Sequence, residues 1–495
     1  MLIAPTLPGQ SRLSFPAPSR LHDPSHITLP QSLKITNSAA SASASIDTQT
    51  HISNLDRILQ KTSRPTPSPI PAVITNHNQT NLAATPASNL FNLLNISNIF
   101  PSLRIDEAFD KYSPRSLTRL HRLLSDSPRS SPKSSIASHW RLLHGAENWS
   151  GLLDPLDENL RRELVRYGEF IQAAYTAFFS NPDSPRHVVL LGLSPPSYRV
   201  TRSLFATSSV ELPRWLDAAA ASALPSWMTQ PSSMIGFVAV CDGTRELARM
   251  GRRDIVVSLR GTATALEWAE NFRSGLQPIS DSTAAKVSSG FYSLYKTEGS
   301  KIPSLSSAVV EEVRRLVEKY KGEELSITIT GHSLGAALAQ LVADEISSEI
   351  EAAPPIAVVS FGGPRVGNRA FAERLEEKGV KVLRIVNAND VVPRVPGVLP
   401  RVWDEGYSHV GVELKVDNRV SPYLRPDADP ACCHDLEAYL HLVDGFMGTG
   451  CPFRVNAKRS LARLLSQQRP NMKKIYVTRA RAVQLEAVSS GGRAG

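Results

Sequence analysis

Cysteine is scarce in this sequence of 495 residues, and its positions argue against a disulfide framework. Four cysteines occur, namely Cys241, Cys432, Cys433 and Cys451, and two of them are adjacent. Adjacent cysteines bond each other only with strain, so a set of stabilising disulfides is not expected. No pair of CxxC motifs and no HExxH motif is present. The sequence therefore gives no support for zinc or redox chemistry, and we expect neither a metal nor an organic cofactor.

Long hydrophobic runs are also missing, and the positive charge lies away from the middle of the chain. No apolar run approaches the roughly 18 to 20 residues that span a bilayer, which predicts a soluble protein or one on a membrane surface. Residues 1–135 carry 13 basic against 7 acidic side chains and residues 453–495 carry 10 against 1, whereas the 317 residues between carry 32 against 38. A nucleic-acid substrate is therefore not expected, because such enzymes concentrate positive charge on their working face.

The N-terminal region has the composition of a targeting segment followed by a linker. Residues 1–50 are rich in Ser, Thr, Ala and Pro with few acidic side chains, which predicts a plastid transit peptide. Pro5 and Pro8 interrupt the apolar run that a secretory signal would need. An unrelated disordered tail and a mitochondrial address are the alternatives. Residues 51–135 stay rich in Pro, Ser and Asn and are interpreted as a low-complexity linker.

From Ile136 onwards the pattern is that of a folded body in which strands alternate with helices. Apolar residues recur at steps of three and four over residues 157–179 and 305–320, as in amphipathic helices. Short β-branched runs predict strands, and further helices are expected from Ala336, over 369–378 and over 435–446. The predicted strands are 234–240 paired with 254–259, then 325–330, 356–361, 380–386 and 410–416. This order predicts an α/β fold with a mostly parallel central sheet and helices on both faces.

One segment carries a motif for nucleophilic catalysis. The predicted strand 325–330 runs into Gly331-His332-Ser333-Leu334-Gly335 and then into an alanine-rich helix. A serine raised on a sharp strand-to-helix turn leaves no space for side chains two residues away on either side, which explains the glycines. The turn also directs the N–H of Leu334 and the helix N-terminus at a developing oxyanion. Gly-x-Ser-x-Gly alone is a weak signal, but this context predicts Ser333 as the nucleophile.

On such a sheet the acid and the histidine follow the serine in chain order. Asp390 lies just after the predicted strand 380–386, where loops point toward the site, although a capping aspartate is the alternative. Three later histidines could supply the base. His434 is preferred because it precedes the predicted helix 435–446 and can swing over the serine. His409 is the second choice, and His441 would lie within the helix.

Taken together, these motifs resemble the class 3, fungal-type lipases, and within them the plant plastid phospholipase A1 group. The resemblance covers roughly residues 138–452 and rests on several motifs in the same order. They are His139-Trp140-Arg141, Asn148-Trp149, Gly151 to Asp157, Arg260-Gly261-Thr262, Gly331 to Gly335, Phe361 to Val366, Asn389-Asp390 and His434-Asp435-Leu436-Glu437. The resemblance implies an α/β-hydrolase fold, with a lipase domain over 136–452. A basic C-terminal tail over 453–495 lies outside this match.

The resemblance also implies two roles next to the serine. The Arg-Gly-Thr turn assigns Thr262, through its backbone N–H and hydroxyl, as the oxyanion partner of the N–H of Leu334, with a simple turn residue as the alternative. The segment that follows looks like the lid of the family, with Leu266, Trp268 and Phe272 among charged residues. The alternative is that Leu266, Ala269 and Phe272, which recur at helical spacing, belong to the core.

The function that the resemblance implies is a serine acylhydrolase that cleaves acyl esters of plastid glycerolipids, with attack at sn-1 favoured and galactolipids as a further substrate class. A triacylglycerol lipase and a catalytically silent binding protein with the same fold are the alternatives. The expected partner is glycerolipid on a membrane or lipid-droplet surface, such as a thylakoid or plastoglobule. No obligate protein partner is inferred. The basic tail could press against anionic lipid or be a solvated tail.

Overall fold

The computed structural model of the chain describes most of the region that the sequence predicts to be folded. The described residues are 135–180, 197–210, 229–271, 273–279, 282–396, 406–454, 464 and 468–478. The predicted transit peptide and all but the last residue of the predicted linker lie outside the described residues. The domain boundaries given above therefore stay predictions.

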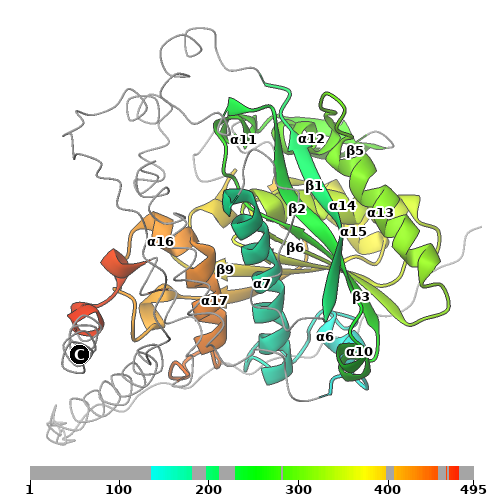
Figure 1. Cartoon of the computed structure of the whole chain (residues 1–495). Helices are drawn as coiled ribbons and strands as arrows, with labels where there is room; N and C mark the ends of the chain where they lie inside the picture. The colour runs from blue at the N-terminus through cyan, green and yellow to red at the C-terminus, as the bar shows by residue number, and fades with distance from the viewer. Residues whose placement is uncertain are drawn as a thin grey trace, which may run out of the picture. The chain divides into compact units, whose positions relative to one another are not determined.

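A seven-stranded sheet forms the centre of the described structure (Figure 1). Its order is β1-β2-β3-β6-β7-β9-β11, with β1, β2 and β3 paired antiparallel and the other pairs parallel. The strands are β1 (Tyr198–Thr207), β2 (Ser232–Cys241), β3 (Arg253–Leu259), β6 (Leu325–His332), β7 (Ile356–Phe361), β9 (Lys381–Asn387) and β11 (Val412–Val416). The predicted α/β fold with a mostly parallel sheet is thus confirmed, and β1 is an addition that the sequence pattern did not predict.

Helices cover both faces of this sheet. One face carries α7 (Glu158–Ser180) and α17 (Leu436–Gly445), which Figure 1 shows side by side. The other face carries α12 (Ser289–Lys296), α13 (Leu305–Lys319), α14 (Leu334–Glu349) and α15 (Arg369–Glu377). Because neighbouring side chains of a strand point to opposite faces, Val256 packs toward α7 and Val257 packs toward α13 and α14.

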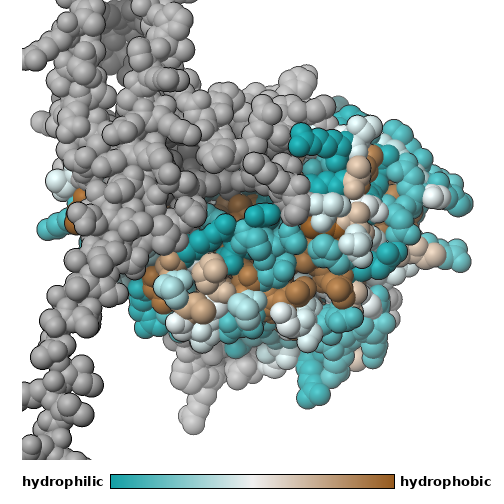
Figure 2. Space-filling view, turned by 90° about the horizontal axis from the view of Figure 1, so that it is seen from below, coloured by the Kyte–Doolittle hydropathy of each residue, from teal (hydrophilic) through white to brown (hydrophobic). Residues whose placement is uncertain are grey.

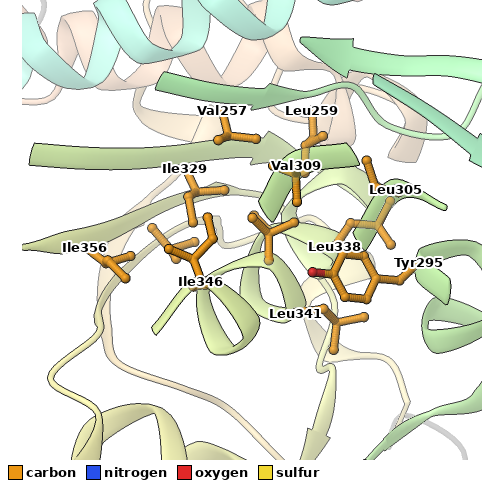
Figure 3. Close-up of a cluster of buried hydrophobic side chains, with 14 of the residues drawn as sticks. Val257, Leu259, Tyr295, Leu305, Val309, Ile329, Leu338, Leu341, Ile346 and Ile356 are labelled. Atoms are coloured by element: carbon orange, nitrogen blue, oxygen red, sulfur yellow. The ribbon is translucent and has the colours of Figure 1, made fainter. Parts of the chain in front are cut away.

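The core on the α13 and α14 side is formed almost entirely by aliphatic side chains. Figure 3 shows Val257 and Ile329 of the sheet facing Val309 of α13 and Leu338 and Ile346 of α14. Each of these five side chains is 0% exposed. Complete burial of a side chain of this size contributes about 1.5 to 3 kcal/mol. Strands β3 and β6, which lead to the candidate site, are therefore held firmly by the packing on this face of the sheet.

Smaller elements surround the ends of the sheet. The sequence patterns did not predict a second sheet, which has the strand order β10-β8-β5-β4. Its strands are β4 (Leu276–Ile279), β5 (Ser282–Ser288), β8 (Gly367–Asn368) and β10 (Tyr407–Ser408). The short helices are α6 (Trp140–Leu143), α10 (Thr244–Met250), α11 (Ala265–Asn271) and α16 (Pro430–His434). Two of these, α11 and α16, flank the candidate site.

The described surface carries few large hydrophobic side chains. Those exposed among the described residues are Leu142, Val395, Val420, Met447 and Ile475. In the face drawn in Figure 2, hydrophobic areas are separated by hydrophilic residues. None of the helices in the described ranges has the length and apolarity needed to cross a membrane.

Candidate active site

Ser333 occupies the turn between β6 and α14, in a backbone conformation that few residues adopt. Its φ and ψ angles are 54° and −121°. A Cβ atom on Gly331 would lie 2.3 Å from the carbonyl carbon of Gly335, and one on Gly335 would lie 2.4 Å from the carbonyl oxygen of Leu259. Both contacts are too short for any side chain. The two glycines are therefore required by the close approach of backbone segments around the serine.

The structure brings the three residues of the predicted triad into hydrogen-bond contact. His434 Nε2 lies 2.8 Å from Ser333 Oγ, and His434 Nδ1 lies 2.7 Å from Asp390 Oδ2. The aspartate side chain is 1% exposed and the imidazole is 12% exposed. Because the buried carboxylate of Asp390 can only accept a hydrogen bond, Nδ1 of the neutral imidazole carries the proton. The unprotonated Nε2 therefore faces the serine hydroxyl. This arrangement suits proton transfer from Ser333.

The carboxylate of Asp390 is fixed by groups other than the histidine. Its Oδ2 also accepts a hydrogen bond of 2.6 Å from the hydroxyl of Tyr439, and its Oδ1 accepts one of 2.9 Å from the N–H of Val392. The Tyr439 hydroxyl in turn accepts from the N–H of Asn387 at 3.1 Å. Burial, with Asp390 beside it, raises the pKa of Tyr439 well above its usual value. The tyrosine therefore stays a donor to the carboxylate.

His434 is the last residue of the short helix α16, where the sequence predicted a loop. Asp429 caps the start of this helix and Pro430 follows it, which is a helix-start signal. At the other end, the backbone carbonyl of His434 lies 2.8 Å from His332 Nε2. The carbonyl of the preceding Cys433 accepts a hydrogen bond of 2.9 Å from Asn387. The backbone around His434 is thus tied directly to β6 and β9.

The Arg260-Gly261-Thr262 turn lies directly against the serine. A Cβ atom on Gly261 would lie 3.1 Å from Ser333 Cβ. The turn is held by Arg260, which is 0% exposed and binds the carboxylate of Glu267 at 2.8 Å and 3.0 Å. Although burial opposes ionisation, the Arg260 guanidinium holds the pKa of Glu267 below its usual value. The same carboxylate accepts a hydrogen bond of 2.7 Å from the N–H of Ala263, so contacts within the segment fix the conformation of the turn.

Thr262 and Leu334, the two residues predicted to form the oxyanion site, lie on either side of the serine in the chain's fold, and their role as donors stays a prediction. Leu334 is the first residue of α14, where backbone N–H groups have no partner within the helix. The hydroxyl oxygen of Thr262 accepts a hydrogen bond of 2.8 Å from the side chain of Asn271 in α11. Because Asn271 donates here, the hydroxyl proton of Thr262 can be donated in another direction. Asn271 is a site residue that the sequence motifs did not single out.

Comparisons with known proteins decide the family. The model of the class 3 lipase family matches residues 256–399, a range that includes Ser333 and Asp390. A chloroplastic phospholipase A(1) of Arabidopsis thaliana is 45% identical over 371 residues, covering 66% of this chain and 81% of the relative. The chain belongs to the class 3 lipase family. The resemblance found from the sequence motifs is thereby confirmed.

Two further proteins are similar to this class 3 lipase. A chloroplastic galactolipase of Arabidopsis thaliana is 37% identical over 346 residues, covering 62% of this chain and 69% of the relative. A solved lipase from Rhizopus microsporus var. chinensis is 23% identical, with a TM-score of 0.38, covering 54% of this chain and 78% of that one. This class 3 lipase is a carboxylic ester hydrolase, and its chloroplastic relatives support a plastid location.

The predicted lid of this class 3 lipase is only partly visible. Leu266 lies in α11 and is 3% exposed, while the side chain of Trp268 and the whole of Phe272 fall outside the described residues. In the same helix Glu270 is 0% exposed and accepts a hydrogen bond of 3.0 Å from Ser293 of α12. The burial of Leu266 agrees with the core alternative for that residue. The lid as a whole stays a prediction.

The other candidate histidines have different partners. His409, the second choice for the base, accepts a hydrogen bond of 3.4 Å from Arg365, and burial lowers its pKa to about 4. His441 is 0% exposed within α17 and lies 2.8 Å from the hydroxyl of Ser421. Both contacts are those of structural residues. Of these candidates, His434 is the one that the structure places on Ser333.

Proposed function

We propose that this lipase hydrolyses the sn-1 acyl ester of plastid glycerolipids through an acyl-enzyme. His434 Nε2 takes the proton of Ser333 as the serine oxygen attacks the ester carbonyl, and Asp390 stabilises the imidazolium that forms. The N–H of Leu334, with the N–H and hydroxyl of Thr262, receives the charge on the carbonyl oxygen. Such donors are worth about 3 kcal/mol each in other serine hydrolases. The observation that carries the proposal is the hydrogen-bonded chain from Ser333 through His434 to Asp390.

The second half of the reaction uses the same groups. The imidazolium gives its proton to the departing lyso-lipid oxygen as the carbonyl reforms, which leaves the acyl group on Ser333. Water then attacks the acyl ester, and His434 takes a proton from this water. The bond between the acyl carbon and Ser333 Oγ breaks, the imidazolium returns the proton to Oγ, and the free fatty acid is released.

The nucleophile is tested by replacing Ser333 with alanine. Both elbow glycines remain in that variant, so the fold is expected to persist while ester hydrolysis falls on the order of a millionfold. Turnover of a short soluble ester and thermal unfolding are measured together. Ser348→Ala, at the exposed far end of the same helix, is the matched control. Retention of more than about a hundredth of the activity by Ser333→Ala would point to another nucleophile.

The substrate is tested with a mixed plastid lipid extract. Mass spectrometry of the products is expected to show lyso-phospholipid that keeps its sn-2 chain, together with free fatty acid. The galactolipase relative makes lyso-galactolipid a second expected product class. If triacylglycerol were the only lipid hydrolysed, with diacylglycerol as the product, the triacylglycerol lipase alternative would be favoured. Failure of a fluorophosphonate to label Ser333 would favour the silent binding protein.

The site of action that we propose is the surface of a thylakoid or plastoglobule, reached after import directed by residues 1–50. The support is the composition of that segment and the chloroplastic relatives. A fluorescent fusion of the full chain is expected to enter plastids, and a fusion that lacks residues 1–50 is expected to stay outside. Import of the shortened fusion would contradict this address.

A further inference from the structure

Part of the chain beyond residue 453 packs against the element that carries His434. In Figure 1 the last described residues lie beside α16. Three of them, Leu464, Met472 and Tyr476, are at most 2% exposed. They form one buried cluster with Tyr423, Leu424, Cys432 and Ala438. Neither interpretation of the basic tail, as a lipid-binding segment or as a solvated tail, included this contact, because both placed the tail outside the fold.

Backbone hydrogen bonds fix the position of this C-terminal segment. Asn471 accepts at its carbonyl from the N–H of Arg425 at 2.8 Å, and the N–H of Lys473 donates to the carbonyl of Tyr423 at 2.9 Å. Leu424 and Met472 form an antiparallel bridge between the two stretches. Residues 471–473 therefore lie along the loop that leads into α16, in a defined register.

The side chain of Asn471 makes a paired contact with Asp429. Its Oδ1 accepts from the backbone N–H of Asp429 at 3.0 Å, and its Nδ2 donates to the Asp429 carboxylate at 2.9 Å. The same Nδ2 donates to Gln468 at 3.1 Å. Asn471 is only 7% exposed. Such a buried amide with partners at both ends has one orientation only.

Asp429 is the N-cap residue of α16, directly before the first helical residue, Pro430. Its second carboxylate oxygen accepts from the N–H of Cys432 at 2.6 Å, and its carbonyl accepts from the N–H of Cys433 at 3.0 Å. The helix has five residues and ends at His434. A helix rises about 1.5 Å per residue, so a helix of five residues is short. A tilt at its first residue therefore also moves its last residue. The position of Asp429 therefore contributes to where the imidazole lies, together with the contacts of Cys433 and His434 to β9 and β6.

We infer that Asn471 is a positioning residue for His434, and that the segment around it acts as a clamp on α16. This inference rests on the proposed role of His434 as the base. The clamp holds Nε2 at hydrogen-bond distance from Ser333 by fixing Asp429 at the opposite end of the helix. A displacement of about 1 Å at a reacting group can cost as much as a hundredfold in rate, so a residue that touches no substrate can control turnover.

The test is Asn471→Asp in the full chain. The new carboxylate cannot donate to Asp429 and places like charge against it, which pushes the start of α16 away. The kcat for a short soluble ester is expected to fall about tenfold, with KM unchanged, since substrate contacts are not altered. The rate of fluorophosphonate labelling at Ser333 should fall in parallel.

The decisive comparison is the exchange variant Asp429→Asn/Asn471→Asp. In it the amide at position 429 caps the helix with its oxygen and donates to the carboxylate at position 471, which also accepts the backbone N–H of residue 429. Recovery of kcat to within about twofold of wild type is expected. Ile475→Ser, at an exposed position 46% accessible in the same segment, is the control and should match wild type.

The outcomes separate this inference from the proposed function. Three results would each overturn the clamp. They are a wild-type kcat in Asn471→Asp, a change in that variant confined to KM, and an exchange variant as slow as the single variant. Turnover is normalised to the fluorophosphonate-reactive fraction, so partial unfolding does not imitate the effect. Absence of labelling and hydrolysis in the wild type would instead overturn the proposed function.

Discussion

The hydroxyl of Tyr175 lies 2.9 Å from Nδ1 of His332, and this pair joins three parts of the site. Burial lowers the pKa of His332 to about 3, so its imidazole is neutral. Since its Nε2 faces the carbonyl of His434, the proton is on Nε2 and Nδ1 must accept from Tyr175. The tyrosine oxygen accepts from the N–H of Gly261 at 2.9 Å. Helix α7 is thereby linked to the oxyanion turn, the elbow and the base.

Tyr175→Phe should lower turnover without loss of the fold. The change leaves the N–H of Gly261 and Nδ1 of His332 buried without that partner, and a group so orphaned costs about 1 to 3 kcal/mol. A fall of about tenfold or more in kcat is expected for a soluble ester, with little change in KM. Steady-state kinetics on this variant and on Tyr292→Phe, a tyrosine of α12, measure it. Equal activity in the two variants would make the link dispensable.

Asn271 should control the direction of the Thr262 proton. In Asn271→Asp the carboxylate would accept that proton and draw it away from the oxyanion, so kcat should fall about 100-fold to 1,000-fold, as when one oxyanion donor is removed. Asn271→Leu only removes the contact, and a smaller loss is expected. Kinetics of both variants on one soluble ester decide the matter. Equal losses would mean that Asn271 serves the packing of α11 and that Thr262 does not donate through its hydroxyl.

His144 should make the stability of the protein depend on pH. It lies 3.0 Å from the hydroxyl of Thr328, and burial lowers its pKa from 6.5 to about 3. Between these values the unfolded chain binds a proton that the folded chain does not. The stability contribution of neutral His144 is therefore complete above pH 6.5 and is lost as the pH falls toward 3.

Urea unfolding of wild type and of His144→Gln at several pH values between these limits measures this effect. The wild-type unfolding free energy should fall more steeply, by up to about 1.4 kcal/mol per pH unit, because the glutamine cannot take up a proton. Parallel curves for the two proteins would show that His144 does not titrate in this range.

Two substitutions in α11 distinguish a lid from a fixed element. Leu266 is buried, so Leu266→Ala should destabilise the protein by about 2 to 5 kcal/mol in thermal or denaturant unfolding. Trp268→Ser should weaken hydrolysis of vesicle-borne lipid much more than that of a short soluble ester, if the indole anchors an opened lid on lipid. Equal losses on both substrates would favour the core alternative for Trp268.

The sequence predicted the parts of this structure that strong local patterns specify. The elbow around Ser333 combines a buried strand, two glycines and an alanine-rich helix. Each of these can be recognised from the local sequence without knowledge of tertiary contacts. The expected strands and helices of the central sheet appear close to their predicted bounds, for example 305–320 against α13. Chain order on the sheet then led to the prediction of Asp390, and the helix that follows His434 led to the prediction of that residue as the base.

What the sequence could not supply depends on contacts between distant segments. Tyr175 has helical spacing in the predicted helix 157–179 and is indistinguishable there from a core residue, yet its hydroxyl reaches Gly261, 86 positions away. Asn471 lies in a basic stretch whose composition resembles a solvated tail, and its partner Asp429 is 42 positions away. Strands β8 and β10 contain two residues each, which is too short for any periodicity.

The φ angle of 54° at Ser333 has a consequence for the evolution of thermal tolerance in this enzyme. Sparsely populated backbone conformations cost about 1 to 3 kcal/mol for a residue that has a side chain, and glycine adopts them more easily. Native interactions around the elbow must offset this strain for as long as the serine is retained. The nucleophile is thus a position where activity and stability trade off, and a more heat-resistant form has to gain its stability elsewhere in the fold.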